Sequence, residues 1–297
     1  MSIEKPFDET AISSYTDVEL LHYITNSPHL QTTRPEAVRR LSSHLVAKPV
    51  PYLIDPQDEV LAMERARSVG VPVPVVHRVV PYKKGRHFLV MNFVDGMTLE
   101  QLWKTIGLLA TVRLALQLRS HLCAMATVNS QTTGGLHSGQ VRSEWIHGVY
   151  GPVDHASPPM FTNHLNWWLT NFKPPQCDFL LEPSLYHILV HQDLAPRNMI
   201  LDRKDRLWII DWGHAGFYPP FMEYVGIEPG CEAMPWIYAR TWTAWCWRLK
   251  WSLFRWVACG FGWRYKKQLT ALSAVRQRSL TYRFARGPHS AGDVRTV

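Results

Sequence analysis

The sequence predicts an α/β fold of the α+β type with two lobes, a small N-lobe that contains a sheet and a larger, mainly helical C-lobe. The chain has 297 residues, of which 46% are hydrophobic, so it can bury a large core without disulfides or structural metal ions. Segments typical of strands dominate before residue 96, and segments with helical periodicity dominate after it. We therefore expect an N-lobe over residues 1–95, a C-lobe over residues 96–279 and a mobile basic tail over residues 280–297.

The predicted N-lobe contains a hairpin, a helix and a buried strand. Residues 38–48 hold two short strand-like segments on either side of the Ser42-Ser43 turn, which is typical of a hairpin. A helix from residue 56 to about 69 follows, because Asp55 suits the N-cap and a proline stands at the first helical position. Residues 87–94 read HFLVMNFV, a run that is apolar and short enough for a buried strand.

The predicted C-lobe begins with two helices. Thr98 and Gln101 have the spacing of a capping box for a short helix, and residues 108–128 carry an apolar face at helical spacing. Residues 130–160 are rich in Gly, Ser, Pro and His and predict a long loop, and residues 161–172 predict another helix.

The net charge of +8 is concentrated at the C-terminal end of the chain. Residues 240–297 contain twelve Lys and Arg against the single acidic residue Asp293, which gives this segment a charge of +11. Subtracting +11 from +8 leaves −3 for residues 1–239. Any argument about an acidic partner therefore applies to the C-terminal segment alone.

The basic segment also contains most of a tryptophan-rich helix. An apolar stripe runs along it at helical spacing, made of Trp242, Trp245, Leu249, Leu253, Trp256 and Gly260, and it is widened by Trp247, Trp251 and Phe254. We expect this stripe to pack in the core of the C-lobe, with Arg248 and Arg255 at its solvated edge. Lining of a substrate pocket and interfacial contact with a membrane are the alternatives.

The sequence predicts a cytoplasmic protein. The five cysteines are odd in number and show no paired spacing, which favours reduced thiols. The first ten residues carry acidic side chains and no apolar run, so we expect no signal or transit peptide. No stretch approaches 18 uncharged apolar residues, so we expect no transmembrane segment.

The chemistry is concentrated in residues 190–212, which read VHQDLAPRNMILDRKDRLWIIDW. Two apolar runs, MIL and LWII, are joined by five polar residues, which predicts a tight antiparallel hairpin. Pairing of these strands places Asn198, just before the first, opposite Asp211, just after the second. Asp193 lies on the same loop, five residues before Asn198, so its carboxylate is expected to face the same space. A carboxylate beside an amide oxygen suits Mg²⁺, which completes its octahedron with water and phosphate oxygens.

His191, Asp193, Asn198 and Asp211 match, in order and spacing, the catalytic loop of kinases and the aspartate that follows the next hairpin. HQDLAPRN followed by IIDW resembles the aminoglycoside phosphotransferase and choline kinase branch of the protein kinase-like fold, with Trp212 in place of the protein-kinase Phe. The segments FVDG and VPVP, at residues 93–96 and 71–74, are similar to family segments at the lobe junction and after the first helix. The resemblance covers roughly residues 38–225.

The resemblance implies an ATP-dependent phosphotransferase that moves the γ-phosphoryl group of Mg-ATP to a hydroxyl group. Asp193 would be the catalytic residue that accepts or orients the hydroxyl proton, and Asn198 and Asp211 would hold the Mg²⁺. We expect His191 to shape the loop through hydrogen bonds more than to act in acid–base chemistry. For Arg197, contact with phosphate oxygens and a structural ion pair are both open.

The same resemblance implies an ATP site between the lobes. Lys48, at a strand end, resembles the lysine that contacts the phosphates, and Glu59 resembles its ion-pair partner, with Glu64 as the competing candidate. The strand end Met91, Asn92, Phe93 and Val94 would be the hinge whose backbone meets adenine.

Three departures from the kinase pattern bear on the substrate. No glycine precedes Gly70, so the Gly-rich phosphate loop is missing and the Ser42-Ser43 turn is expected to cover the phosphates. Gln192 replaces the arginine that can receive an activation-loop phosphate, and only eleven residues separate Asp211 from Glu223. The replacement at Gln192 and the short segment between Asp211 and Glu223 favour a small-molecule substrate over a protein. If that substrate is a cation, the candidate acidic groups are Asp154, Asp178, Glu182, Glu223, Glu228 and Glu232.

Two alternatives of another class remain. The missing glycines would also fit an ATP-binding pseudokinase or scaffold with weak or no catalysis. The basic C-terminus would fit a binder of nucleic acid or of an anionic membrane surface, although we expect no specific nucleic-acid partner. The sequence leaves the substrate and the oligomeric state open.

Overall fold

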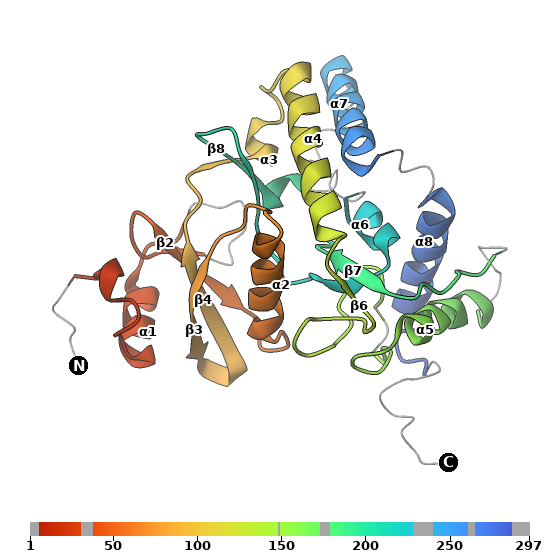
Figure 1. Ribbon diagram of the computed structural model, residues 1–297, viewed down its shortest axis with the longest axis horizontal. Coiled ribbons are helices and arrows are strands. Elements are labelled where there is room, and N and C mark those ends of the chain that lie inside the picture. Colours follow the sequence, from red (N-terminus) through yellow and green to blue (C-terminus); the bar gives the residue numbers. More distant parts are fainter. Residues whose placement is uncertain are drawn as a thin grey trace, which may run out of the picture.

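The computed structural model describes residues 6–30, 38–147, 149–172, 179–227, 240–260 and 265–286. One part of the molecule is a four-stranded sheet with a helix on either side, and the other is a group of helices around two small sheets (Figure 1). The predicted two-lobed α+β fold is confirmed. The predicted boundary at residue 95 lies between the last strand of the large sheet and the next strand of the chain, and the division into domains stays a prediction.

The described elements have the following bounds. The strands are β1 (Arg39–Arg40), β2 (Leu45–Val50), β3 (Val76–Tyr82), β4 (Arg86–Asn92), β5 (Gly96–Thr98), β6 (Asn129–Ser130), β7 (His187–Val190), β8 (Met199–Asp202), β9 (Leu207–Ile209) and β10 (Gly216–Tyr218). The helices are α1 (Asp17–Asn26), α2 (Pro56–Ser68), α3 (Leu99–Leu102), α4 (Leu108–Met125), α5 (Pro158–Thr170), α6 (Pro220–Ile227), α7 (Trp242–Cys259) and α8 (Lys266–Thr281).

The N-lobe sheet has the strand order β1-β2-β4-β3 and is antiparallel throughout. β1 pairs with β2 across the Ser42-Ser43 turn, so the predicted hairpin is confirmed. Alternation along β2 sends Val46 and Ala47 to opposite faces. Val46 packs in one cluster with Ala62 of α2, and Ala47 packs in another with Leu20 of α1. Each face of the sheet is therefore covered by one helix (Figure 1).

The predicted helix starts agree with the structure. Asp55 caps α2 by accepting a hydrogen bond from the Gln57 N–H at 2.9 Å, and Gly70, with φ of +86°, follows its end. Thr98 and Gln101 form the predicted capping box, but α3 extends only over four residues. The predicted loop over residues 130–160 contains one short strand, β6, and the first turn of α5.

Helix α7 forms as predicted, but only part of its predicted apolar stripe packs in the core. Trp251 and Phe254 are buried as expected, together with Ala244 and Ala258. Trp242, Trp245, Leu249 and Trp256, which were also expected in the core, are 73%, 42%, 50% and 51% exposed. The helix is apolar on both faces, so periodicity alone could not choose the buried one, and packing against α4 made the choice.

Among the described helices, α1, α6 and α8 were not predicted. α1 begins at a capping box of Thr16 and Glu19, a spacing that was readable in the sequence. α8 continues to Thr281, and the Arg283 carbonyl then accepts a hydrogen bond from Val149 N–H at 2.7 Å. The rest of the predicted mobile tail, residues 287–297, lies outside the described residues. Within the described ranges, no helix combines the length and the apolar character needed to cross a membrane.

Candidate active site

The N-lobe contributes Lys48 and Glu59 to the site. Lys48 follows Val46 by two residues on β2, so its side chain points to the α2 face of the sheet. Glu59 shares one face of α2 with the buried Ala62, Met63 and Ala66, which places its carboxylate under the sheet. Glu64 lies on the exposed side of α2. Helical geometry thus selects Glu59 over Glu64 as the partner of Lys48.

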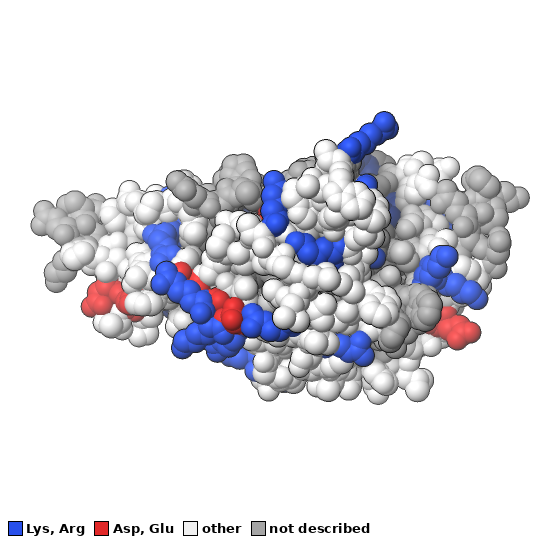
Figure 2. All heavy atoms as spheres, turned by 90° about the horizontal axis from the view of Figure 1, so that it is seen from above, with Lys and Arg blue, Asp and Glu red and all other residues white. Residues whose placement is uncertain are grey.

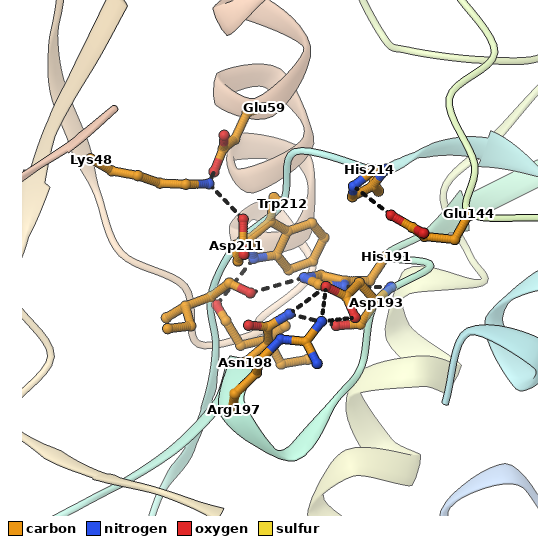
Figure 3. Close-up of polar contacts among 12 residues, drawn as sticks. Lys48, Glu59, Glu144, His191, Asp193, Arg197, Asn198, Asp211, Trp212 and His214 are labelled. Atoms are coloured by element: carbon orange, nitrogen blue, oxygen red, sulfur yellow. Dashed lines mark hydrogen bonds and ion pairs between the residues drawn. The ribbon is translucent and has the colours of Figure 1, made fainter. Parts of the chain in front are cut away.

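Lys48 joins the two lobes through two ion pairs (Figure 3). Its Nζ lies 2.5 Å from Glu59 Oε1 and 2.7 Å from Asp211 Oδ1. Burial alone would lower the pKa of the Lys48 ammonium, but the charges of Asp211 and Glu59 outweigh burial and raise it. The Lys48 charge in turn lowers the pKa of Asp211, against the effect of burial. Lys48 and Asp211 are therefore held in their charged forms at neutral pH.

Asp193 is held in place by two side chains of its own loop. One Arg197 nitrogen donates to both Asp193 carboxylate oxygens, at 2.9 Å each. Asn198 Nδ2 donates to the Asp193 carbonyl at 2.9 Å and to its Oδ2 at 2.8 Å. Of the two open roles for Arg197, the structure contains the ion pair, and its partner is the predicted catalytic carboxylate.

The β8–β9 hairpin brings Asn198 and Asp211 to one end, as the sequence predicts, but with a different register. Met199 pairs with Ile209, and the Ile210 N–H donates to the Asn198 carbonyl at 3.0 Å. Asn198 is therefore opposite Ile210, and Asp211 is one residue further on. Asp211 has a φ of +66°, a strained conformation for a residue with a side chain, and such strain is concentrated at functional sites.

The end of the hairpin fits a magnesium ion. Asn198 uses its amide nitrogen on Asp193, so its amide oxygen is turned away from that carboxylate (Figure 3). Asp211 has one oxygen on Lys48, which leaves the other to coordinate. One carboxylate and one amide oxygen match the few protein ligands that Mg²⁺ takes beside phosphates. The described residues contain no cluster of three or more His, Cys, Asp or Glu that could hold a metal ion.

His191 is buried and shapes the loop, in line with the structural role expected for it. Its Nδ1 accepts from the Asp193 N–H at 3.2 Å, which leaves the ring proton on Nε2, 3.0 Å from the Ile210 carbonyl. Burial lowers the pKa of His191 to about 4, so the ring is neutral at physiological pH. It packs edge-on against the buried Trp212, with ring centroids 4.8 Å apart. His191 thereby ties the catalytic loop to the residue before Asp211.

Behind the loop lies Glu223, which the sequence proposed as an acidic group for a cationic substrate. That expectation is wrong, because Glu223 is 7% exposed and its Oε2 accepts from the His191 N–H at 2.5 Å. Burial raises the pKa of Glu223 to about 7, although hydrogen bonds from the His191 and Gln192 N–H groups act in the other direction. Gln192 has a φ of +65°, and its side chain donates to the Arg142 and His214 carbonyls. Glu223 and Gln192 therefore support the turn that presents Asp193.

The predicted hinge is only partly available to a ligand. Met91 and Val94 are buried, the Asn92 N–H donates to the Val75 carbonyl at 3.0 Å, and the Phe93 N–H donates to the His44 carbonyl at 2.7 Å. The Asn92 and Phe93 N–H groups therefore already donate hydrogen bonds within the protein.

The Ser42-Ser43 turn is held by Arg40, which the sequence did not single out. The Arg40 guanidinium donates to the Ser42 and Ser43 carbonyls at 2.5 and 2.6 Å and lies 3.4 Å over the Phe93 ring. Ser42 Oγ accepts from the His44 and Leu45 N–H groups at 3.1 Å each. Side-chain contacts thus order a turn that has no glycine.

Buried hydrogen bonds of Asp58, which the sequence did not predict, fix α2 in place. We call this set of contacts the Asp58 clamp. Asp58 is 2% exposed and accepts hydrogen bonds from the His137 and Ser138 N–H groups, from Ser138 Oγ and from the Arg142 guanidinium. A Cβ on Gly135 would lie 2.4 Å from the Asp58 carboxylate, so only glycine fits there. The long 130–160 loop therefore anchors the helix that carries Glu59.

The same loop carries an acidic side chain that pairs with His214. Glu144 Oε1 lies 3.7 Å from His214 Nε2, and Figure 3 places this pair on the Asp193 side of the site. Glu144 is 57% exposed in its side chain and was not among the predicted candidates. Of those candidates, Asp154 and Glu182 are exposed, and Asp178, Glu228 and Glu232 lie outside the described residues.

A protein-family model described as APH, the phosphotransferase enzyme family, matches residues 29–246, well over half of the chain. The match contains Lys48, Glu59, the catalytic loop and Asp211. No curated protein matches the chain significantly.

Solved structures similar to the chain include kinases and aminoglycoside phosphotransferases. Aminoglycoside phosphotransferase APH(4)-Ia is 17% identical, with a TM-score of 0.47 over 91% of this chain and 99% of that chain. The GDP complex of wild-type aminoglycoside 2'-phosphotransferase-IIIa is 16% identical, with a TM-score of 0.43 over 90% and 99%. The kinase PK-1 of Cydia pomonella Granulovirus is 14% identical, with a TM-score of 0.40 over 76% and 73%.

Proposed function

This chain belongs to the phosphotransferase enzyme family, and from that membership we propose that it transfers the γ-phosphoryl group of Mg-ATP to a hydroxyl of a small molecule. The observation that carries the proposal is the meeting of two charged groups from different lobes. Lys48 of the N-lobe contacts Asp211 at 2.7 Å, and Asp211 lies at the same open end of the β8–β9 hairpin as Asn198, which contacts Asp193. A phosphate-binding cation, a metal-binding pair and a candidate base then share one space.

The nucleotide would lie between β2 and the β8–β9 hairpin. Lys48 would bind phosphate oxygens and stay oriented by Glu59, which is rigid because α2 is clamped through Asp58. Asn198 and Asp211 would hold the Mg²⁺, whose chemistry is to bridge and neutralise the phosphate oxygens. With the Asn92 and Phe93 N–H groups engaged, the Val94 backbone is the part of the hinge that we assign to adenine.

Asp193 would act on the acceptor. Its carboxylate would accept a hydrogen bond from the substrate hydroxyl and take the proton as the new bond to phosphorus forms and ADP leaves. Arg197 would keep that carboxylate oriented through its contacts at 2.9 Å. His191, neutral and buried, would fix the loop and exchange no proton.

We assign a small molecule, and not a protein, as the acceptor. Only eleven residues lie between Asp211 and Glu223, and they form β10 and the start of α6, which leaves no segment for docking a peptide. Glu144 supplies an exposed carboxylate on the acceptor side of Asp193, so an acceptor with a cationic group fits the site.

The proposal is tested by a metabolite screen that measures Mg-dependent ADP release from ATP. We expect an acceptor with a hydroxyl group to be phosphorylated by the wild type. The isosteric change Asp193→Asn removes the base and should slow turnover by about a hundredfold or more, in the range of general-base catalysis. Asp205→Asn, at an exposed carboxylate on the β8–β9 turn, is the matched control and should leave turnover unchanged. Near wild-type turnover by Asp193→Asn would refute the base assignment.

A further inference from the structure

The outward face of α7 carries exposed aromatic and aliphatic side chains that lie next to one another. Trp242, Trp245 and Leu249 are 73%, 42% and 50% exposed, and the two tryptophans stack on each other with centroids 4.8 Å apart. Single exposed apolar residues are ordinary, but contiguous aromatic groups on one helix face mark an interaction site.

Packing within the fold does not account for this face. The opposite face of α7 already packs on α4 through Trp251, Phe254 and Ala258, and Trp103 meets Trp251 at 5.2 Å. Lys250 points inward as well and donates to the Trp103 carbonyl at 2.5 Å. The core is thus complete without the outward tryptophans, and their surface is left for a contact outside the described residues.

The exposed apolar surface continues at one end of the molecule. α4 and α7 run side by side and both begin at the upper end in Figure 1. The first residues of α4, Leu108 and Leu109, are 61% and 85% exposed, next to the end where Trp242 begins α7. This apolar tip therefore has leucines on one helix and tryptophans on the other.

The charge around the tip is positive. Arg240 stands just before helix α7 and Arg248 lies on it, and no Asp or Glu occurs from residue 240 to residue 292. Figure 2, seen from above onto this end, shows more Lys and Arg than Asp and Glu. The acidic Asp205 on the β8–β9 turn is paired with Arg113 of α4 at 3.2 Å. An anionic surface would meet little repulsion here.

We propose that the tip formed by the starts of α4 and α7 binds the surface of an anionic lipid bilayer. Tryptophan beside Arg and Lys is the composition of helices that lie in the membrane interface, with the rings at headgroup depth and the cations on lipid phosphates. The exposed stripe from Trp242 to Leu249 is about 10 Å long and can lie along the interface. No described helix is long and apolar enough to cross a membrane. An acidic protein would match the charge equally, but the exposed indole rings and leucines favour lipid. This proposal does not depend on the phosphotransferase activity.

The experiment is co-sedimentation of the full chain with vesicles of phosphatidylcholine alone or with about 30% phosphatidylserine, at two salt concentrations. Brominated lipids in the same vesicles report whether tryptophan enters the interface, because bromine quenches indole fluorescence on contact. We expect binding to the serine-containing vesicles, weakening with salt, together with quenching.

Three variants locate the contact. Trp242→Ala/Trp245→Ala/Leu249→Ser should lower the partition coefficient by about tenfold or more, since interfacial affinity scales with buried apolar area. Arg240→Gln/Arg248→Gln should weaken only the binding that depends on phosphatidylserine. Val18→Ser/Leu185→Ser is the matched control, because these side chains are 77% and 88% exposed on other elements, and it should bind as the wild type does. All substituted side chains are exposed or half-buried, and thermal melting checks that each variant folds.

Several results would overturn the proposal. Binding of neither vesicle type would do so, as would equal binding by the apolar triple variant. A dimer that dissociates in the triple variant, in place of lipid binding, would identify a second copy of the chain as the occupant. Quenching that persists in the triple variant would place the contact on other tryptophans.

Discussion

At the scale of single residues, the site depends on ion pairs between its own side chains. Lys48 pairs with Glu59 and Asp211 across the lobes, and Asp193 pairs with Arg197 within one loop. Each carboxylate that would act on a substrate or metal is thus held by a cation of the protein. Binding of Mg-ATP would exchange these partners for Mg²⁺ and phosphate groups, so the side-chain charges would stay paired.

Glu223 gives the molecule a specific pH dependence. Its pKa is raised from 4.5 to about 7 by burial, so the folded state holds a proton that the unfolded state has lost between these values. Stability from this group is fully present below pH 4.5 and is lost as pH rises through about 7, on the order of 1 kcal/mol per pH unit. Glu223→Gln, which cannot ionise, should remove this slope. Urea unfolding of both proteins from pH 4.5 to 7.5 measures the difference, and parallel curves would contradict the assignment.

At the scale of elements, the orientation of α2 decides whether Glu59 meets Lys48. Asp58 anchors that helix to the 130–160 loop with hydrogen bonds to two backbone N–H groups and two side chains. The catalytic loop has a similar support, because a Cβ on Gly226 of α6 would lie 2.4 Å from the Gln192 carbonyl. Close approach of backbone to backbone thus fixes the turn before Asp193.

Breaking the Asp58 clamp should destabilise the fold strongly. Asp58→Ala leaves the Arg142 charge and two N–H groups buried without their acceptor, at a cost of about 3–5 kcal/mol in the free energy of unfolding. Asp17→Ala breaks the half-exposed pair with Arg78 at 2.7 Å and is the matched control, with an expected cost of about 1 kcal/mol or less. Denaturant unfolding of the two variants measures both costs. Equal losses would show that the clamp contributes no more than a surface ion pair.

The sequence predicted the local elements well. The β8–β9 hairpin and the caps of α2 and α3 depend on residues a few positions apart, so spacing alone reveals them. The register of the hairpin was wrong by one residue, because the pairing of Met199 with Ile209 depends on packing and not on the length of the turn. For the same reason the stripe predicted for the core on α7 included side chains that are exposed, such as Trp242 and Trp245.

At the scale of the whole molecule, the contacts that escaped prediction join segments far apart in the chain. The pairing of Asp58 with Arg142 spans 84 positions, and that of Lys48 with Asp211 spans 163. Neither follows from local periodicity, although the second was reachable through the family resemblance. The molecule therefore has two separate functional candidates. One is the site between the lobes, and the other is the apolar tip at the starts of α4 and α7, whose positions can be followed in Figure 1.

Binding of Mg-ATP to the site between the lobes tests the central claim most directly. Thermal unfolding would be followed with ATP and Mg²⁺ together, with ATP and a chelator, and with Mg²⁺ alone, for the wild type and for Asp211→Asn. We predict stabilisation of the wild type by about 2.7 kcal/mol at a hundred times Kd, only when ATP and Mg²⁺ are both present. Asp211→Asn should lose the part that requires Mg²⁺. No stabilisation of the wild type, or the same Mg²⁺-dependent shift in the variant, would contradict the account.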